Sequence, residues 1–190
     1  KTERKTAREI IENYDGPKVR IMEVCGTHTH EIFRLGIRKL LPEQVELISG
    51  PGCPVCVTPV SFIDEAIYLA LEKGVTICTF GDLVRVPGTK MSLAGAREQG
   101  ADIHVVYSPA DAEKYAGEHP DKQVTFLSVG FETTTPASCL SVKAAKENGL
   151  DNYSILTANK TMPQAYESLK GSADVFLYPG HVNAITGTRL

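Results

Sequence analysis

The chain has 190 residues, of which 42% are hydrophobic and 23% charged, and its formal net charge is −3. This composition is typical of a globular protein, and the slight negative charge offers no basic surface for nucleic-acid phosphates. No apolar run approaches the roughly 18 residues of a membrane-spanning helix, and the charged start lacks the apolar core of a signal peptide, so we expect a cytoplasmic protein that binds neither nucleic acid nor membranes.

Short β-branched runs alternate with amphipathic segments along the chain. Strands are expected at 18–24, 45–48, 75–80, 103–107, 124–129, 153–157 and 175–178, and helices at 6–14, 30–41, 61–72, 91–99, from 109, 136–148 and 162–169. This alternation predicts an α/β fold with mainly parallel sheets and helices on both faces. We expect two similar α/β lobes, 1–107 and 108–190, because the pairs Ser108-Pro109 and His119-Pro120 interrupt the alternating pattern near this boundary.

Most of the unusual residues follow directly after an expected strand. They are Cys25, Cys53, Cys56, Asp82, Arg85, Glu132 and His181. In open parallel sheets, ligands bind outside the carboxyl ends of the strands, where loops and helix N-termini converge. We therefore expect a single site at this rim, with the sulfurs of the first three cysteines brought together.

The motif C-G-T-H-T-H places Cys25 between the end of a strand and the start of a helix. The partial positive charge of a helix N-terminus and a nearby imidazolium both favour the thiolate, which is the nucleophilic and metal-binding form. His28 is the histidine we expect to face the cysteine, with His30 capping or packing. The alternative is a small buried cysteine in a packed turn.

The motif G-P-G-C-P-V-C gives Cys53 and Cys56 the C-x-x-C spacing, which closes a small disulfide or chelates one metal ion. An odd cysteine count and the lack of a secretory signal favour metal or redox chemistry over a disulfide framework. One pair cannot complete a four-ligand zinc site, although Cys25 and His28 are available to fill it. A pair that switches between dithiol and disulfide beside a separate metal-binding cysteine fits better.

The remaining candidates also have structural interpretations. Glu132, in G-F-E-T-T-T-P, is either a site residue or a helix-start carboxylate with the threonines as caps. His181 follows closely after the end of the strand expected at 175–178. Cys78 falls within an expected strand and Cys139 within an expected helix, so both are predicted to be core residues.

Together, five motifs resemble the HypD-type maturation factors of nickel–iron hydrogenases. In chain order they are C-G-T-H-T-H at 25–30, G-P-G-C-P-V-C at 50–56, F-G-D-L-V-R-V-P-G at 80–88, G-F-E-T-T-T-P at 130–136 and P-G-H-V at 179–182. Their order, and their spread over most of the chain, make this resemblance far more specific than a single C-x-x-C.

The resemblance implies a scaffold that helps to assemble an Fe(CN)2CO centre before its delivery to the hydrogenase large subunit. The iron is implied to be held between a cysteine of the scaffold, matched here by Cys25, and one of a small HypC-type chaperone. Cys53 and Cys56 match a thiol pair that supplies or relays electrons, and His28 matches the histidine beside the iron-binding cysteine. Cyanide is implied to arrive from a HypE-type partner. Thiolate ligands suit iron of this kind.

The chain departs from the family in one respect. Family members are longer and carry further cysteines near the C-terminus that bind a four-iron, four-sulfur (4Fe-4S) cluster, whereas this sequence stops at Leu190 without them. We therefore expect no such cluster in this piece.

Two other functions are compatible with the thiols. The first is a metal-independent thiol–disulfide oxidoreductase, which would use Cys53 and Cys56 and be indifferent to Cys25. The second is a cysteine hydrolase that uses Cys25 as nucleophile together with a histidine, for which the sequence reveals no oxyanion-binding group and no Asn or Asp partner. The resemblance favours a metallocofactor assembly factor with thiol redox chemistry over a conventional turnover enzyme.

Overall fold

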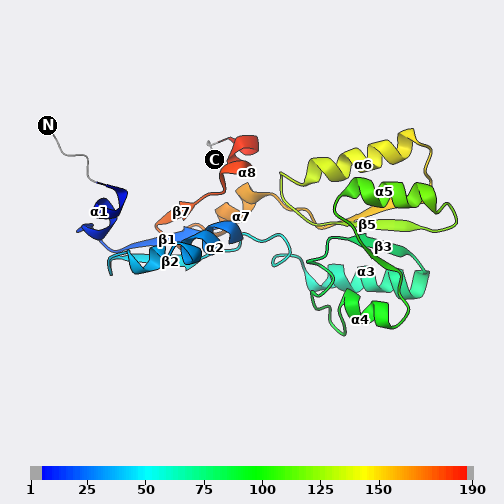
Figure 1. Cartoon of the computed structure of the whole chain (residues 1–190), viewed down its shortest axis with the longest axis horizontal. Coiled ribbons are helices and arrows are strands. Elements are labelled where there is room, and N and C mark those ends of the chain that lie inside the picture. Colours follow the sequence, from blue (N-terminus) through cyan, green and yellow to red (C-terminus); the bar gives the residue numbers. More distant parts are fainter. Residues whose placement is uncertain (1–5, 188–190) are drawn as a thin grey trace. The chain divides into compact units, whose positions relative to one another are not determined.

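The computed structural model describes residues 6–187. Its strands form two separate sheets, both entirely parallel (Figure 1). The chain divides into two compact units: unit 1 comprises residues 1–53 and 162–190, and unit 2 comprises residues 54–161. Unit 2 is therefore inserted between two parts of unit 1.

Unit 1 is built on a three-stranded sheet with the order β2-β1-β7. Its elements are α1 (Ala7–Glu12), β1 (Val19–Glu23), α2 (Gly26–Arg34), the 3-10 helix η1 (Ile37–Lys39), β2 (Val45–Ser49), α7 (Met162–Ser168), β7 (Val175–Leu177) and α8 (Gly180–Thr186). In the register of the sheet, Glu23 at the end of β1 lies between Ser49 and Leu177. These three strand ends, with the loops that follow them, form one edge of unit 1.

Unit 2 is built on a four-stranded sheet with the order β4-β3-β5-β6. Its elements are α3 (Val60–Lys73), β3 (Thr76–Thr79), α4 (Leu93–Glu98), β4 (Ile103–Val105), α5 (Pro109–Glu118), β5 (Val124–Ser128), α6 (Thr135–Glu147) and β6 (Tyr153–Thr157). Helices α3 and α4 cover one face of this sheet, and α5 and α6 cover the other (Figure 1). All residues of the central strands β3 and β5 are buried, as expected for parallel strands covered on both faces.

Local sequence signals determine where the helices of unit 2 begin and end. Ser108 and Asp111 form a reciprocal capping box at the start of α5, and Pro109 occupies its first position. Helix α3 ends at Gly74, whose φ of 65° lies in the left-handed region that glycine adopts without steric cost.

The α/β prediction with parallel sheets is confirmed, and every expected strand is present near its expected position. Two helices differ from the prediction: α2 begins at Gly26, directly after Cys25, and α8 was not anticipated. The units also divide the chain differently from the expected lobes 1–107 and 108–190. β5, from beyond residue 108, pairs with β3, so a boundary at 107 would cut through one hydrogen-bonded sheet. None of the helices in the described part of the chain is long and apolar enough to cross a membrane.

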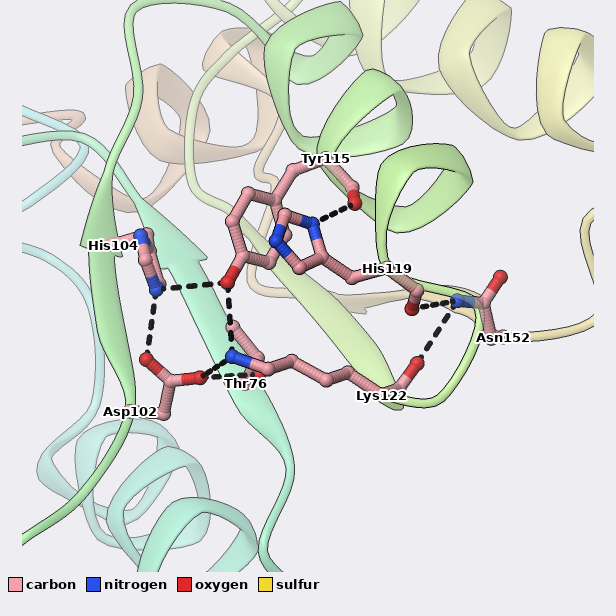
Figure 2. Close-up of polar contacts among 7 residues, drawn as sticks. All are labelled: Thr76, Asp102, His104, Tyr115, His119, Lys122 and Asn152. Carbon is pink, nitrogen blue, oxygen red and sulfur yellow. Dashed lines mark hydrogen bonds and ion pairs between the residues drawn. The ribbon is translucent and has the colours of Figure 1, made fainter.

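A polar cluster ties together the amino ends of the strands in unit 2 (Figure 2). The carboxylate of Asp102 accepts hydrogen bonds from Thr76 Oγ1 at 2.8 Å and from Lys122 Nζ at 2.9 Å, and lies 2.7 Å from His104 Nε2. The Tyr115 hydroxyl lies 3.2 Å from the same His104 nitrogen and accepts from Lys122 Nζ at 3.1 Å. Partial burial alone raises the pKa of Asp102, but these hydrogen bonds outweigh it and bring the pKa to about 2.

Asp102→Asn should therefore destabilise unit 2 near neutral pH and have little effect in acid. Because the folded-state pKa lies below the ordinary value, the folded chain binds fewer protons, and this contribution is present above about pH 4 and lost as the pH falls towards about 2. After allowance for solvent screening of the part-exposed carboxylate, the loss should be on the order of 1 kcal/mol. Urea unfolding at several pH values measures it, with the exposed Asp151→Asn as control; a pH-independent difference would contradict the assignment.

Candidate functional site

Cys25 occupies the N-cap of α2, at the point where β1 ends. Its side chain makes no capping hydrogen bond, and its carbonyl oxygen accepts from the Thr29 backbone N–H at 3.2 Å. The residue is part-buried and forms no disulfide. A thiol is thus held at the positive end of a nine-residue helix, as the motif predicted.

The second cysteine loop lies directly against the first. The Gly50 N–H donates to the Glu23 carbonyl oxygen at 2.8 Å, which carries the pairing of β1 and β2 into the loops. A Cβ added to Gly52 would overlap the Val24 carbonyl group and lie 2.5 Å from the Cys25 backbone nitrogen. Glycine is needed here because two backbones touch. Cys53, the next residue, is consequently held beside the Cys25 loop.

The C-x-x-C motif spans the division between the two units. Cys53 is part-buried and is the last residue of the first segment of unit 1, whereas Cys56 is exposed and belongs to unit 2. Between them the chain forms a turn, in which Thr58 donates its backbone N–H to Val55 O and its hydroxyl to Pro54 O. The two sulfurs are not joined in a disulfide.

No group of three or more His, Cys, Asp or Glu side chains within residues 6–187 is arranged to hold a metal ion. A 4Fe-4S cluster requires four cysteine thiolates, so the residues present do not fit that cluster.

The two histidines of the first motif lie on opposite sides of α2. His28 is part-buried and lines a hollow of about 340 Å³ together with Ile32, Ile37 and Leu177. Its Nδ1 atom is buried and has no hydrogen-bond partner. His30 is exposed. His28 is therefore the inward-facing histidine of the motif, and its facing Cys25 stays a prediction. Of the two roles expected for His30, capping or packing, the packing role is wrong because the side chain is exposed.

Glu23 is the residue of this region that sequence reasoning missed. Its side chain is completely buried at the end of β1, where Oε1 accepts from Arg38 Nη2 at 2.9 Å and from Ser49 Oγ at 2.8 Å. Oε2 is buried without a partner. A signal was available: Glu23 continues the inward alternation of Val19 and Ile21, so a carboxylate stands where an apolar residue is expected.

The two remaining candidates, Glu132 and His181, lie in different units. Glu132 follows β5 in unit 2, and the hydroxyls of Thr134 and Thr135 donate to the Phe131 carbonyl oxygen instead of capping α6. His181 is exposed in the first turn of α8, in unit 1. Thr134 occupies the N-cap position of α6, but its hydroxyl makes no capping hydrogen bond. Site roles for Glu132 and His181 stay predictions.

The two cysteines outside the motifs differ from one another. Cys78 is buried in β3, and burial raises the pKa of its thiol to about 12, so the thiol is protonated and inert. Its prediction as a core residue is confirmed. Cys139 is exposed on α6, and its prediction as a core residue is wrong because the helix directs this position to the surface.

Comparison with known proteins places the chain among the hydrogenase formation proteins. The HypD family model, described as "Hydrogenase formation hypA family", matches residues 1–190. The hydrogenase maturation factor HypD of Cupriavidus necator is 46% identical over 185 residues, covering 92% of this chain and 49% of that protein. HypD of Escherichia coli is 47% identical over 174 residues, covering 90% and 47%. HypD of Azotobacter vinelandii is 42% identical over 198 residues, covering 98% and 52%. The chain thus spans about half the length of these relatives.

Proposed function

This chain belongs to the HypD family of hydrogenase maturation factors, and from that membership we propose that it helps to assemble the Fe(CN)2CO moiety of nickel–iron hydrogenase. In this proposal the iron is cargo, held during assembly and then passed on. Cys25 supplies one thiolate, and a cysteine of a HypC-type chaperone supplies another. A HypE-type partner delivers cyanide.

The position of Cys25 supports its role as the iron-holding residue. Its thiol lies at the start of α2, where the helix N-terminus carries a partial positive charge. Thiolates are suitable ligands for low-spin iron that carries cyanide and carbon monoxide. A single protein thiolate leaves the remaining positions to ligands and to the partner, so the iron can be released when the partner departs.

The seating of Gly52 on the Cys25 loop is the observation that carries this proposal. It brings motif 25–30 and the first part of motif 50–56, residues 50–53, to one edge of unit 1 and holds Cys53 beside the Cys25 loop. When the thiols of Cys53 and Cys56 are oxidised to a disulfide, they give up two electrons and two protons. We propose that this pair supplies electrons in this way during assembly. His28, which lies in the first turn of α2, is the nearby imidazole.

Cys25→Ala tests the proposal in the complex with a HypC-type chaperone. We expect the variant to fold and to lose the iron that co-purifies with the wild-type complex, as measured by elemental analysis and by the infrared bands of bound cyanide and carbon monoxide. Cys139→Ala is the matched control, because that thiol is exposed on α6 and should not affect iron. Wild-type iron in Cys25→Ala would remove the central role of Cys25. Thiol–disulfide activity that persists in such a variant would favour the metal-independent oxidoreductase.

A further inference from the structure

The edge of unit 1 that carries Cys25 contains two buried polar atoms without partners. They are Oε2 of Glu23 and Nδ1 of His28. An unpaired polar atom in a protein interior is destabilising, because it has lost its hydrogen bonds to water without replacement. A carboxylate oxygen only accepts hydrogen bonds, whereas an imidazole nitrogen can donate, so the two atoms are chemically complementary.

Both side chains belong to the same layer, between α2 and the sheet. Glu23 and Leu177 are register partners, so their side chains lie on the same face of the sheet. Leu177 lines the same hollow as His28 and Ile37, and Arg38, the residue after Ile37, holds Glu23 Oε1. Cα–Cβ bonds of a helix tilt towards its N-terminus, and for α2 this is the end that follows β1. The carboxylate and the imidazole therefore flank one small region.

Glu23 also connects the bases of both cysteine loops. Its side chain binds Ser49, the residue before Gly50-Pro51-Gly52-Cys53, and it stands two residues before Cys25. Arg38 adds a third attachment from η1. A side chain held at Oε1 by two donors has a fixed direction, and this leaves Oε2 as the oxygen available to a further donor.

The two atoms are not hydrogen-bonded to one another in the structure, where each is unpaired. We propose that Glu23 is a positioning residue for the Cys25 site, and that its Oε2 accepts a hydrogen bond from His28 Nδ1–H in the folded protein in solution. This hydrogen bond fixes the ring orientation and places the proton of the neutral imidazole on Nδ1. Nε2 is then left with a lone pair, available as an acceptor or ligand beside the iron. Carboxylates commonly orient histidines in this way at metal centres. The part that concerns iron depends on the proposed function, whereas the hydrogen bond and the tautomer do not.

The tautomer of His28 tests the proposal directly. In the ¹⁵N-histidine-labelled chain at about pH 8, where an ordinary imidazole is neutral, two-bond ¹H–¹⁵N spectra should show the proton on Nδ1, with the signal assigned by its loss in His28→Gln. Glu23→Gln should remove the preference, because the amide no longer offers a charged acceptor. Glu46→Gln, at an exposed carboxylate of β2, should retain the wild-type tautomer. A proton on Nε2 in the wild-type chain would overturn the proposal, whether or not the variants fold.

The iron-loaded complex gives a second readout. Glu23→Gln should lower iron retention by about tenfold or more, as is typical when the carboxylate behind a histidine at a metal centre is removed, and Glu46→Gln should not. If Glu23→Gln changed neither the tautomer of His28 nor the amount of iron retained, Glu23 would have no positioning role, and the proposed function would be unaffected. Iron retained in Cys25→Ala, together with a tautomer that responds to Glu23→Gln, would contradict the proposed function and leave the positioning role standing.

Discussion

Gly52→Ala is expected to separate the two cysteine loops and to destabilise unit 1. The added Cβ would overlap the carbonyl group of Val24 and crowd the Cys25 nitrogen at 2.5 Å. These are backbone atoms at the end of the central strand, so no flexible side chain can move aside. Overpacking of this kind costs about 1–3 kcal/mol, and the structure can relieve it only by moving the loop that carries Cys53 away from Cys25.

Two measurements test this expectation. Denaturant unfolding gives the loss of stability, and a short bifunctional thiol reagent, analysed by mass spectrometry, reports the proximity of Cys25 and Cys53. We expect lower stability and a lower yield of the cross-link between these two cysteines in Gly52→Ala. Gly26→Ala is the matched control: it makes the same substitution next to Cys25, where a Cβ would meet nothing within 4 Å. Wild-type stability and cross-linking in Gly52→Ala would refute the close seating of the loops.

Phe126→Ala is expected to cause the largest loss of stability in unit 2. Phe126 is completely buried in β5 and packs edge-on against Phe80, with ring centroids 5.4 Å apart. Both faces of the strand are covered by helices, so the structure can collapse only partly around the missing ring. Truncation of a buried phenylalanine costs about 3–5 kcal/mol, which is a large part of the total stability of a domain.

Urea unfolding followed by fluorescence and circular dichroism measures this loss. Tyr107→Ala is the control, because its side chain also carries an aromatic ring in unit 2 but is 92% exposed. That variant should stay within about 0.5 kcal/mol of the wild type. A loss below about 1.5 kcal/mol in Phe126→Ala would mean that the side chains around β5 pack less tightly than their complete burial indicates.

The strands were predictable because each one is a short β-branched run between helical segments. The expected and observed bounds of β6 are identical, and α5 begins at Pro109 as expected. The start of α2 was misplaced because Gly26 and the residues that follow are poor helix formers. There the helix is held by its packing against the sheet, through Ile32, and not by local propensity.

The two lobes were harder to delimit, because sequence order does not reveal which strands become neighbours. The chain forms β1 and β2, passes through the whole of unit 2, and returns to add β7 beside β1. Residues 19–23 and 175–177 thus share a sheet although more than a hundred and fifty positions separate them. Only the pairing of the folded strands identifies the boundaries at 53/54 and 161/162.

The sequence by itself determined the class of fold and the placing of Cys25 and Cys53 directly after strands, because local periodicity and turn residues are encoded over a few positions. The tertiary structure alone decided that Gly52 touches the Cys25 backbone, that Glu23 is buried between Arg38 and Ser49, and that His28 turns inward while His30 turns outward. These features depend on contacts between segments far apart in the chain. The desolvation cost of burying a carboxylate such as that of Glu23 is offset only when hydrogen-bonding partners from those segments are in place.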